Sequence, residues 1–390
     1  MKITIITSES LKDFPPAITL LHTLERLGHS VTFLSPYRDA YWEDMGLQKA
    51  DHRYVLESIP HWMGAYHPQR IRASLAFHSE QLLRRICLRR LPGKFAEILE
   101  GSDVVWILNE NTTLLGGKGF VDRLGPFMQT MYELHIKNGR VPEFYNYATN
   151  KALLTVVPEY NRAHICKAYY ALPHMPAIIP NKPLVHPRQK NLPISDPAIA
   201  GKVARIKASG KKIVMYMGIL SDERPLEPII EAVEQLPEYT LAVLGGRTPY
   251  LDRLEKTMAG RFEYLGSVKP PHHLEVASHA DVTYISYVAG NHSINAVFCA
   301  PNKVYEFAGF GIPMLCNDNP GLKYTVEYGG FGVCVPELTT PHIASALKHI
   351  DANAESMGEA ANRYFDSESV EQAVFHALER YIAIKKGADR

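Results

Sequence analysis

Short apolar runs alternate with longer amphipathic stretches along nearly the whole chain. KITIIT (2–7), SVTFL (30–34) and DVVWIL (103–108) have the length and the β-branched content of buried strands. Helical segments such as 16–27 and 143–151 fit between runs of this kind. The alternation predicts βαβ units, and therefore parallel sheets with helices packed on their faces.

The same pattern continues through the second half of the chain. The expected strands are 2–7, 30–34, 103–108, 127–132, 153–157, 177–180, 212–218, 240–245, 262–266, 282–286, 313–316 and 331–335. The expected helices are 16–27, 80–91, 143–151, 159–169, 226–236, 249–259, 271–279, 302–309, 340–350 and 367–386.

A stretch rich in proline and polar residues divides the two halves. It reads PNKPLVHPRQKNLPISDP from position 180 and has no apolar period, which is typical of a linker. We therefore predict an α/β protein with two doubly wound, Rossmann-like domains, 1–180 and 201–365, joined by a linker at 181–200. Ligands of such domains bind outside the carboxyl ends of the strands, so we expect the two domains to face a cleft that holds the site. The helical segment 366–390 is long enough to cross back to the first domain.

Composition narrows the range of partners. The chain has 390 residues and a formal net charge of +1, so it lacks the overall basic field that attracts nucleic acid. Its five cysteines are widely spaced without a C-x-x-C pair, which indicates free thiols in a reducing cytoplasm and no zinc site. The N-terminal residues do not resemble a signal peptide, and no apolar run reaches the roughly 18 residues of a membrane span. We expect a cytoplasmic protein.

The segment PNKVYEFAGFGIPMLCND (301–318) carries the first candidate chemistry. Pro301 precedes a helix start, Asn302 is a suitable N-cap, and Glu306 lies one turn further on. Gly311 suits the left-handed position after a helix, where the chain turns into a buried strand. An exposed glutamate on an ordinary helix explains this pattern equally well.

The segment resembles the nucleotide-sugar segment of retaining glycosyltransferases of the GT-B fold, and of glycosyltransferase family 4 in particular. The resemblance implies that Glu306 holds the ribose of a donor nucleotide, because a carboxylate accepts from two vicinal hydroxyls at once. Asn302, Lys303 and Tyr305 on the same helix would also lie at the nucleotide. The family usually has a second glutamate eight positions earlier, where this chain has Phe298.

Other segments of the second half match the same family. YMGILSDERPLEP implies that Arg224 binds the donor phosphates, with Gly218 allowing close approach and a helix starting near Pro225. FEYLGSVKPPHHL places Val268 beside the base, and LAVLGGRTPY places Gly245 near the cleft. In place of the missing glutamate, the loop 288–300 offers polar groups for the sugar and the diphosphate: Asn291, His292, Ser293 and Asn295. Each of these is, by itself, as typical of an ordinary polar loop.

In the first half, TMYELHIKN ends a predicted strand at the edge where cleft residues belong. The resemblance implies that His135 contacts the donor sugar near the reacting carbon, with Glu133 as a second catalytic candidate. A histidine at a strand end is, without that resemblance, more often structural. The candidates on the acceptor side follow neighbouring strands: Asn109, Glu110, Ser8 and Asp13.

Positions 66–94 carry arginines interleaved with leucine and isoleucine, and Glu80 is the one acid among them. A basic amphipathic helix suits an anionic membrane surface, which predicts peripheral association with the inner face of a membrane. A solvated basic helix explains the segment equally well.

The resemblance thus implies a transferase that moves a sugar, with UDP as the expected carrier, to a hydroxyl of a glycan or lipid-linked glycan, with retention. Bacterial surface polysaccharide or glycoconjugate synthesis is the expected context. No cofactor and no metal are expected, because no D-x-D pair stands where one would be needed. Two alternatives remain open: a nucleotide-sugar 2-epimerase of the same fold, and a non-catalytic partner that keeps the fold, which Phe298 motivates.

Overall fold

The computed structural model describes residues 1–57, 70–288 and 293–388, and it divides into two compact units. Met1–Pro180 and Ser369–Arg390 make up the first unit, and Asn181–Glu368 makes up the second. The segment 181–200, predicted as a linker, is therefore part of the second unit. Its side chains and amides are engaged there: Asn181 Nδ2 donates to the carbonyl of Ala300 at 3.0 Å, and the amide of Leu192 donates to Ser278 Oγ at 3.0 Å.

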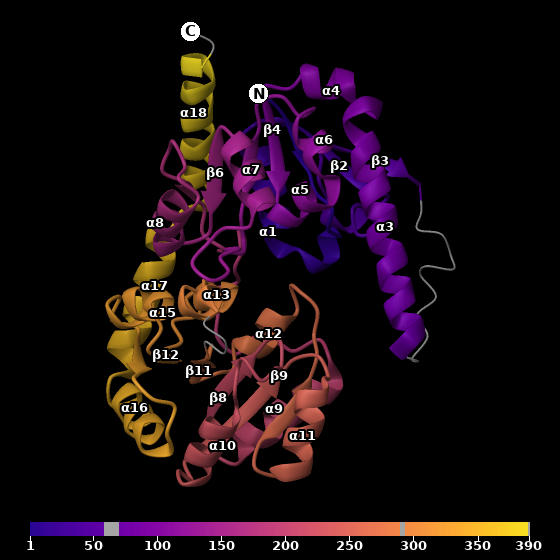
Figure 1. The fold of residues 1–390 in the computed structure, drawn as a ribbon. Helices are drawn as coiled ribbons and strands as arrows, with labels where there is room; N and C mark the ends of the chain where they lie inside the picture. The colour runs from indigo at the N-terminus through magenta and orange to yellow at the C-terminus, as the bar shows by residue number, and fades with distance from the viewer. Residues whose placement is uncertain (58–69, 289–292, 389–390) are drawn as a thin grey trace. The chain divides into compact units, whose positions relative to one another are not determined.

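The first unit is built on a parallel sheet with the strand order β3-β2-β1-β4-β5-β6-β7 (Figure 1). The strands are β1 (Lys2–Ile6), β2 (Ser30–Tyr37), β3 (Ala50–Leu56), β4 (Val104–Leu108), β5 (Met128–Thr130), β6 (Leu154–Val157) and β7 (Ala177–Ile178). The helices are α1 (Pro15–Arg26), α3 (Arg70–Lys94), α4 (Ala96–Glu100), α5 (Glu110–Gly116), α6 (Lys118–Val121), α7 (Glu143–Lys151), α8 (Tyr160–Tyr169) and α18 (Val370–Ala388), with a 3-10 turn η1 (Leu11–Asp13). The order reverses between β1 and β4, which places the switch point of the sheet at the ends of these strands.

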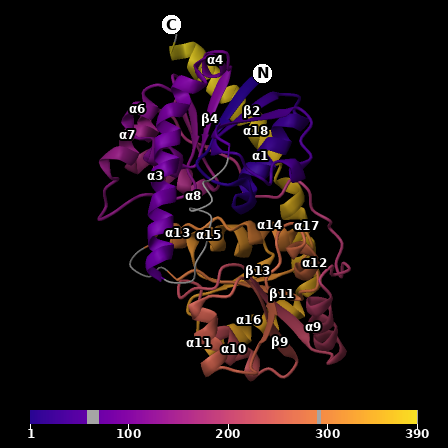
Figure 2. The same ribbon diagram turned by 90° about the vertical axis from the view of Figure 1, so that its right-hand side faces the viewer.

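Helices pack on both faces of this sheet (Figures 1 and 2). Successive residues of β4 point to opposite faces, as the period of a strand requires. Trp106 joins a buried cluster with residues of α1 and α18, whereas Ile107 joins a second cluster with residues of α3 and α5. The C-terminal helix therefore supplies one side of the core of the first unit.

The second unit repeats this plan with the order β10-β9-β8-β11-β12-β13. The strands are β8 (Lys212–Met217), β9 (Tyr239–Leu244), β10 (Glu263–Gly266), β11 (Val282–Ile285), β12 (Met314–Asn317) and β13 (Gly332–Val335). The helices are α9 (Pro197–Ala208), α10 (Glu227–Glu234), α11 (Pro249–Thr257), α12 (His273–Ala277), α13 (Ile294–Val297), α14 (Asn302–Ala308), α15 (Pro320–Leu322), α16 (Thr340–Ala352) and α17 (Ala354–Ser367). The switch point lies at the ends of β8 and β11.

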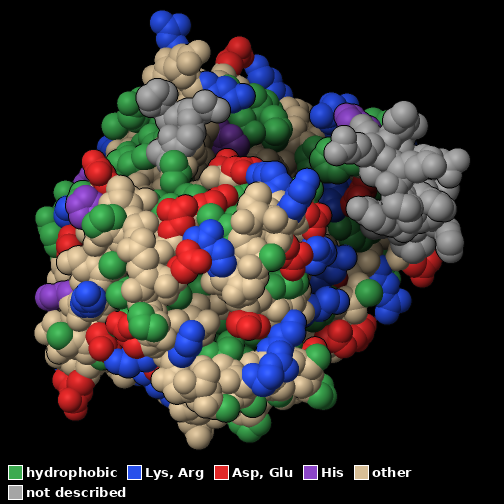
Figure 3. Space-filling view, turned by 90° about the horizontal axis from the view of Figure 1, so that it is seen from below, with side chains coloured by type: hydrophobic (Ala, Val, Ile, Leu, Met, Phe, Trp, Pro, Cys, Tyr) green, Lys and Arg blue, Asp and Glu red, His purple; other side chains and the backbone are tan. Residues whose placement is uncertain are grey.

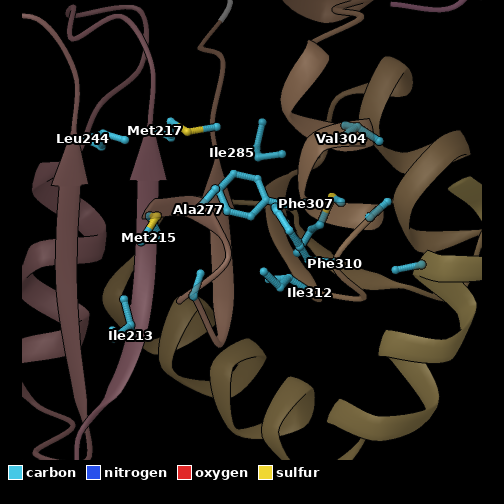
Figure 4. Packing of buried hydrophobic residues seen from close by; sticks show 14 of the residues in the cluster. Ile213, Met215, Met217, Leu244, Ala277, Ile285, Val304, Phe307, Phe310 and Ile312 are labelled. Atoms are coloured by element: carbon cyan, nitrogen blue, oxygen red, sulfur yellow. The ribbon is translucent and has the colours of Figure 1, made fainter. Parts of the chain in front are cut away.

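Two hydrophobic clusters fill the faces of the second sheet. α9, α12, α14 and α17 contribute to one of them, and α10, α11 and α16 contribute to the other. Figure 4 shows Phe307 of α14 in the first cluster with Met215 of β8 and Ile285 of β11. Burial of one side chain of the size of Phe307 contributes about 2 kcal/mol, so α14 is firmly held on the sheet.

Each predicted strand has a counterpart in the structure, and the structure adds β3. This strand pairs only with β2 within the described residues, at the edge of the sheet. Its sequence ADHRYVL exposes Asp51 and Arg53, which is how edge strands avoid pairing with other chains. We predicted strands from apolar runs, and the charged residues of β3 interrupt such a run.

Basic and acidic side chains are interspersed on the face that Figure 3 shows, in keeping with a net charge of +1. Of the helices in the described part of the chain, none combines the length and the apolar character needed to cross a membrane.

Candidate functional site

The carboxyl end of β8 forms a tightly packed corner at the switch point of the second sheet. Gly218 has φ +136°, and a Cβ there would lie 2.7 Å from Cε and 2.8 Å from Nζ of Lys303. A Cβ at Gly245, which follows β9, would collide with the carbonyl oxygen of Gly218. Gly218 thus admits the side chain of Lys303, and Gly245 admits the backbone at Gly218.

Lys303 and Arg224 bring two positive charges to this corner. Nζ of Lys303 lies 4.5 Å from the ring centroid of Tyr216, and Cζ of Arg224 lies 5.0 Å from that of Tyr287. Among the described residues neither cation forms an ion pair, and Nε of Arg224 is buried without a hydrogen-bond partner. Two neighbouring cations that form no ion pair with the described residues create a positive potential that favours an anionic ligand.

The environment of Lys303 also changes its protonation. Burial and the positive charge of Arg224 lower the pKa of the Lys303 ammonium to about 7, and the negative charge of Glu306 opposes part of this change. An anion at the corner would favour the protonated form of this lysine.

Glu306 lies in α14, which begins at the predicted residue but has a different cap. Pro301 has the extended backbone of a cap residue (ψ 136°), and Asn302 is the first helical residue, so Asn302 is not the N-cap. Val304 and Phe307 point into the core, which leaves the Glu306 side chain 13% exposed beside that buried face. Glu306 Oε1 lies 3.1 Å from Nε2 of His273 in α12.

Two glycines close the end of α14. Gly311 has φ +65°, the left-handed conformation that the sequence predicts, and its amide donates to the carbonyl of Ala308 at 2.9 Å. A Cβ at Gly309 would lie 2.6 to 2.7 Å from the ring atoms of His186. Nε2 of His186 lies 2.9 Å from the carbonyl oxygen of Glu306, so this glycine allows a histidine of the segment 181–200 to hold α14.

Tyr305 lies on the same helix but contacts α17. Its hydroxyl accepts a hydrogen bond from the Tyr364 hydroxyl at 3.1 Å, and the two rings stack with centroids 5.6 Å apart. Tyr305 therefore fastens α14 to α17, and its place at a nucleotide stays a prediction.

Val268 follows β10 and borders a pocket of about 250 Å³. The other residues around this pocket are Ile194, Ser195, Asp196, His272, Glu275 and Val276. Apolar walls with a few polar groups are suited to a flat ring, which fits the predicted place of the base.

The loop after β11 is described only in part. Asn291 and His292 lie outside the described residues. Ser293 accepts a hydrogen bond from the amide of Ala296 at 3.4 Å and caps α13, which contains Asn295 and is followed by Phe298. Ser293 therefore caps a helix. The sequence suggested either a ligand of the sugar or an ordinary polar loop, and did not predict this cap.

The segment around Arg224 leads into α10. This helix begins at Glu227, two residues after Pro225 and one after the predicted start at 226, with Pro228 in its first turn. The carbonyl of Pro225 accepts hydrogen bonds from the hydroxyls of Tyr284 at 3.2 Å and Ser286 at 3.4 Å. Arg224 therefore precedes the helix, in a turn that the side chains of β11 and its following residue fix.

In the first unit, Glu110 is the centre of a buried network at the end of β4. Its side chain is 2% exposed and lies in the first turn of α5, where a carboxylate is favoured. It accepts hydrogen bonds from the amides of Tyr132 at 3.0 Å and Glu133 at 3.2 Å. Glu110, predicted on the acceptor side, thus holds the backbone of the segment that contains Glu133 and His135.

Glu110 also reaches His135, whose side chain is 23% exposed. The distance between His135 Nε2 and Glu110 Oε1 is 3.3 Å, and the ring stacks on Tyr145 at 3.8 Å with planes 6° apart. The amide of His135 donates to the Tyr170 hydroxyl at 3.0 Å. Three separate contacts fix this histidine, while Glu133 is exposed beside it.

The remaining first-unit candidates lie at the ends of β1 and β4. Asn109 has φ +62° and accepts from the amide of Thr112 at 3.0 Å, so it caps α5. Ser8 is buried and its amide donates to Thr112 Oγ1 at 2.9 Å. Asp13 ends η1. The structure thus brings Ser8 and Asn109 together at the switch point through Thr112.

No family model and no curated protein matches the sequence. Solved structures do match over nearly the whole chain. A crystal structure of Anabaena HepE in complex with UDP and glucose is 13% identical, with 97% of this chain and 99% of that chain covered and a TM-score of 0.66. A glycosyltransferase from Rickettsia africae is 14% identical, with 99% of both chains covered and a TM-score of 0.67. Sucrose-phosphate synthase from Thermosynechococcus elongatus is 14% identical, with 98% and 99% covered and a TM-score of 0.66.

The chain has the GT-B fold. The predicted fold class is therefore confirmed, and with it the resemblance at the level of the fold. In the GT-B fold of this chain, no group of three or more His, Cys, Asp or Glu within the described ranges is arranged as a metal site.

Three residues that contact the candidate segments around Glu306 and Tyr132 were not predicted as site residues. His273 and His186 contact Glu306, and buried Arg162 donates to the carbonyl of Tyr132. All three act on residues far away in the sequence, so no local spacing signals them. The amide of Arg162 also donates to Glu159 Oε2 at 3.0 Å, at the start of α8.

The basic helix α3 differs from a uniformly solvated helix. Arg84 turns inward and donates to Glu80 at 3.1 Å, to the carbonyl of Ser8 at 3.0 Å and to Glu9 at 3.2 Å. On the opposite face Leu82 is 57% and Ile86 is 40% exposed. The basic residues exposed around these two are Arg85, Arg89 and Arg90.

Proposed function

We propose that this protein is a glycosyltransferase that uses a nucleotide-sugar donor, with UDP as the carrier. The observation that carries the proposal is the corner of the second unit where Glu306 and the cations Lys303 and Arg224 meet at the switch point. Lys303 precedes Glu306 by three residues on α14, so an anion and a neighbouring diol can be bound by one helix. A nucleoside diphosphate presents such a pair of groups in its phosphates and its ribose.

The roles within this corner follow from charge and geometry. Lys303 and Arg224 would bind the diphosphate and stabilise the charge that develops on it as the sugar leaves. Gly218 makes room for the side chain of Lys303 beside the phosphates, and Glu306 would accept from both ribose hydroxyls. The pocket beside Val268 supports a base at the edge of the same sheet.

The fold supports the choice of donor. HepE, which shares the fold, was also crystallised in complex with UDP-glucose. For this chain we propose a UDP-sugar, transfer with retention, and an acceptor hydroxyl on a glycan or lipid-linked glycan of a bacterial surface polysaccharide or glycoconjugate. Phe298 stands where the family usually has its second acid. Backbone and polar groups of the loop 288–300 would take the role of that acid.

In the first unit, we propose that His135 contacts the donor sugar and that Glu133 lies at the reacting centre. Glu110 fixes the ring and the two amides of this segment, which pre-positions both groups. Ser8, Asn109 and Asp13 would then form the acceptor side. The exposed face of α3 would bring the enzyme to an anionic membrane from the cytoplasmic side.

The test is UDP affinity, measured by calorimetry on the wild type, on Glu306→Ala and on Glu231→Ala as a control from an exposed position of α10. Loss of a charged hydrogen-bond acceptor should weaken UDP binding about tenfold to a hundredfold. Glu231→Ala should bind UDP as the wild type does. Unchanged affinity in Glu306→Ala would remove the central observation.

The products distinguish the alternatives. A transferase releases UDP slowly from a UDP-sugar even without its acceptor. An epimerase converts one UDP-sugar into another without free UDP, and a non-catalytic partner binds the donor and releases nothing. A panel of UDP-sugars, followed by product analysis, separates these outcomes.

A further inference from the structure

Two consecutive histidines at the start of α12 turn to different carboxylates. His272 is the N-cap residue and His273 is the first helical residue. Nδ1 of His272 lies 2.7 Å from Glu275 Oε1 in an exposed pair on the same helix. Nε2 of His273 lies 3.1 Å from Glu306 Oε1, and these two side chains are only 15% and 13% exposed.

The chemistry of the pair fixes the direction of this hydrogen bond. An ionised carboxylate has only acceptors, so Nε2 of His273 must carry the hydrogen. Nδ1 of His273 is buried, and among the residues that the structure describes it has no hydrogen-bond partner. A neutral ring with its hydrogen on Nε2 leaves an unpaired acceptor at Nδ1, whereas a charged ring would leave a buried N–H unpaired at a larger cost.

A second histidine holds the same glutamate through its backbone. Burial lowers the pKa of His186 to about 4, so its ring is neutral near pH 7 and Nε2 donates to the carbonyl of Glu306 at 2.9 Å. The ring stands where a Cβ of Gly309 would be, and it packs against Phe310 and Phe365. The backbone of Glu306 is therefore fixed, and the remaining freedom lies in the torsions of its side chain.

We propose that His273 is a positioning residue that sets the carboxylate of Glu306 for a ribose. This inference rests on the proposed function. A carboxylate has about four lone-pair sites, and His273 occupies one of them on Oε1. Within the described part of the chain, one site on Oε1 and both on Oε2 receive no other hydrogen bond, which is enough for the two donors of a vicinal diol. His273 thereby removes rotamers of Glu306 before the ligand arrives.

The proposal predicts an effect confined to ligands with ribose hydroxyls. Kd is measured for UDP and for 2′,3′-dideoxy-UDP with the wild type, His273→Ala, His273→Gln and His376→Ala. His273→Ala should weaken UDP about tenfold, which corresponds to the ordering of one flexible side chain, and leave the dideoxy analogue within about twofold. His273→Gln, whose amide nitrogen stands near the place of Nε2, should regain most of the UDP affinity.

His376→Ala is the matched control, because it also removes a histidine that pairs with a carboxylate, Glu379, but at an exposed position of α18 in the first unit. It should bind both nucleotides as the wild type does. Equal weakening of both nucleotides in His273→Ala would show a structural role and overturn the proposal, as would unchanged UDP affinity. If His273→Ala fails to fold, His273→Leu and His273→Gln decide the question, since only glutamine restores the donor.

The same data separate this inference from the proposed function. If Glu306→Ala binds UDP as tightly as the wild type, the ribose site itself is wrong. If Glu306→Ala loses UDP affinity selectively over the dideoxy analogue and His273→Ala does not, the site stands and only the role of His273 is refuted.

Discussion

Lys303 shows how strongly one position can change the chemistry of a side chain. Burial and Arg224 lower its pKa from the ordinary value of 10.5 to about 7. Between these two pH values the unfolded chain binds a proton at this lysine that the native protein lacks, so this group makes the free energy of unfolding rise with pH from about 7 to 10.5. The neutral form of Lys303 therefore binds an anion less well than the charged form.

The pH dependence of UDP affinity follows from this. A bound diphosphate favours the charged lysine, so binding takes up a proton above pH 7 and Kd should rise by up to about tenfold per pH unit between pH 7.5 and 9. Calorimetry in buffers with different ionisation enthalpies measures the proton directly. Lys303→Met should bind UDP more weakly and without this proton uptake. A wild-type Kd that stays constant over this range would contradict the lowered pKa.

Single residues differ in how far the sequence reveals them. The sequence places Glu306 in a helix and Gly311 after its end, because neighbouring residues mark the last turn and the end of this helix. Lys303 was placed on the same helix, but its contact with Gly218 and its altered pKa depend on a strand that lies far away in the sequence. His273 and His186 stayed unpredicted because only the packing of α12 and of the segment 181–200 on α14 brings them to Glu306.

At the scale of elements, apolar runs predicted the strands, and α14 and α10 begin within one residue of the predicted 302 and 226. The cap was predicted less well, because Pro301, and not Asn302, is the N-cap of α14. The edge strand β3 escaped prediction because its outward side chains are charged. Helices α9 and α17 were not predicted, because α9 begins inside the proline-rich segment 181–200 and α17 is polar along much of its length. Tertiary packing decides their conformation.

α3 makes a testable prediction at this scale. Its exposed face combines Leu82 and Ile86 with arginines, which suits the headgroup region of an anionic bilayer. The full chain should float with vesicles that contain phosphatidylglycerol at low salt, and not with neutral vesicles. The triple substitution Arg85→Ser, Arg89→Ser, Arg90→Ser should abolish flotation.

The matched control removes the same charge elsewhere on the first unit, at the exposed residues Lys49, Lys137 and Arg140. Their triple replacement by serine should leave flotation largely intact. Equal loss in both variants would mean that overall charge, and not the face of α3, governs binding. Arg84 is left unchanged, because it holds the residues after β1 and its loss would disturb the unit.

At the scale of the whole molecule, the two units share one topology but carry different chemistry. The nucleotide contacts that we propose all lie in the second unit, at Gly218, Arg224, Lys303 and Glu306. Hydrogen exchange on the full chain should therefore show that UDP protects amides of 218–226 and of α14. Amides of the first unit around His135 should respond to a UDP-sugar more than to UDP. Protection by UDP confined to the first unit would refute this division.

The return of α18 to the first unit has a consequence for synthesis. Val374, Leu378 and Tyr381 fill the same cluster as Ile5 and Trp106, so the face of the first sheet that they cover lacks its partner while the chain is being made. The second unit, which is continuous in sequence, emerges from the ribosome complete before α18 does. The unit that begins the chain is therefore the last to finish folding, and a ribosome that stalls before residue 370 releases an apolar sheet face that chaperones have to shield.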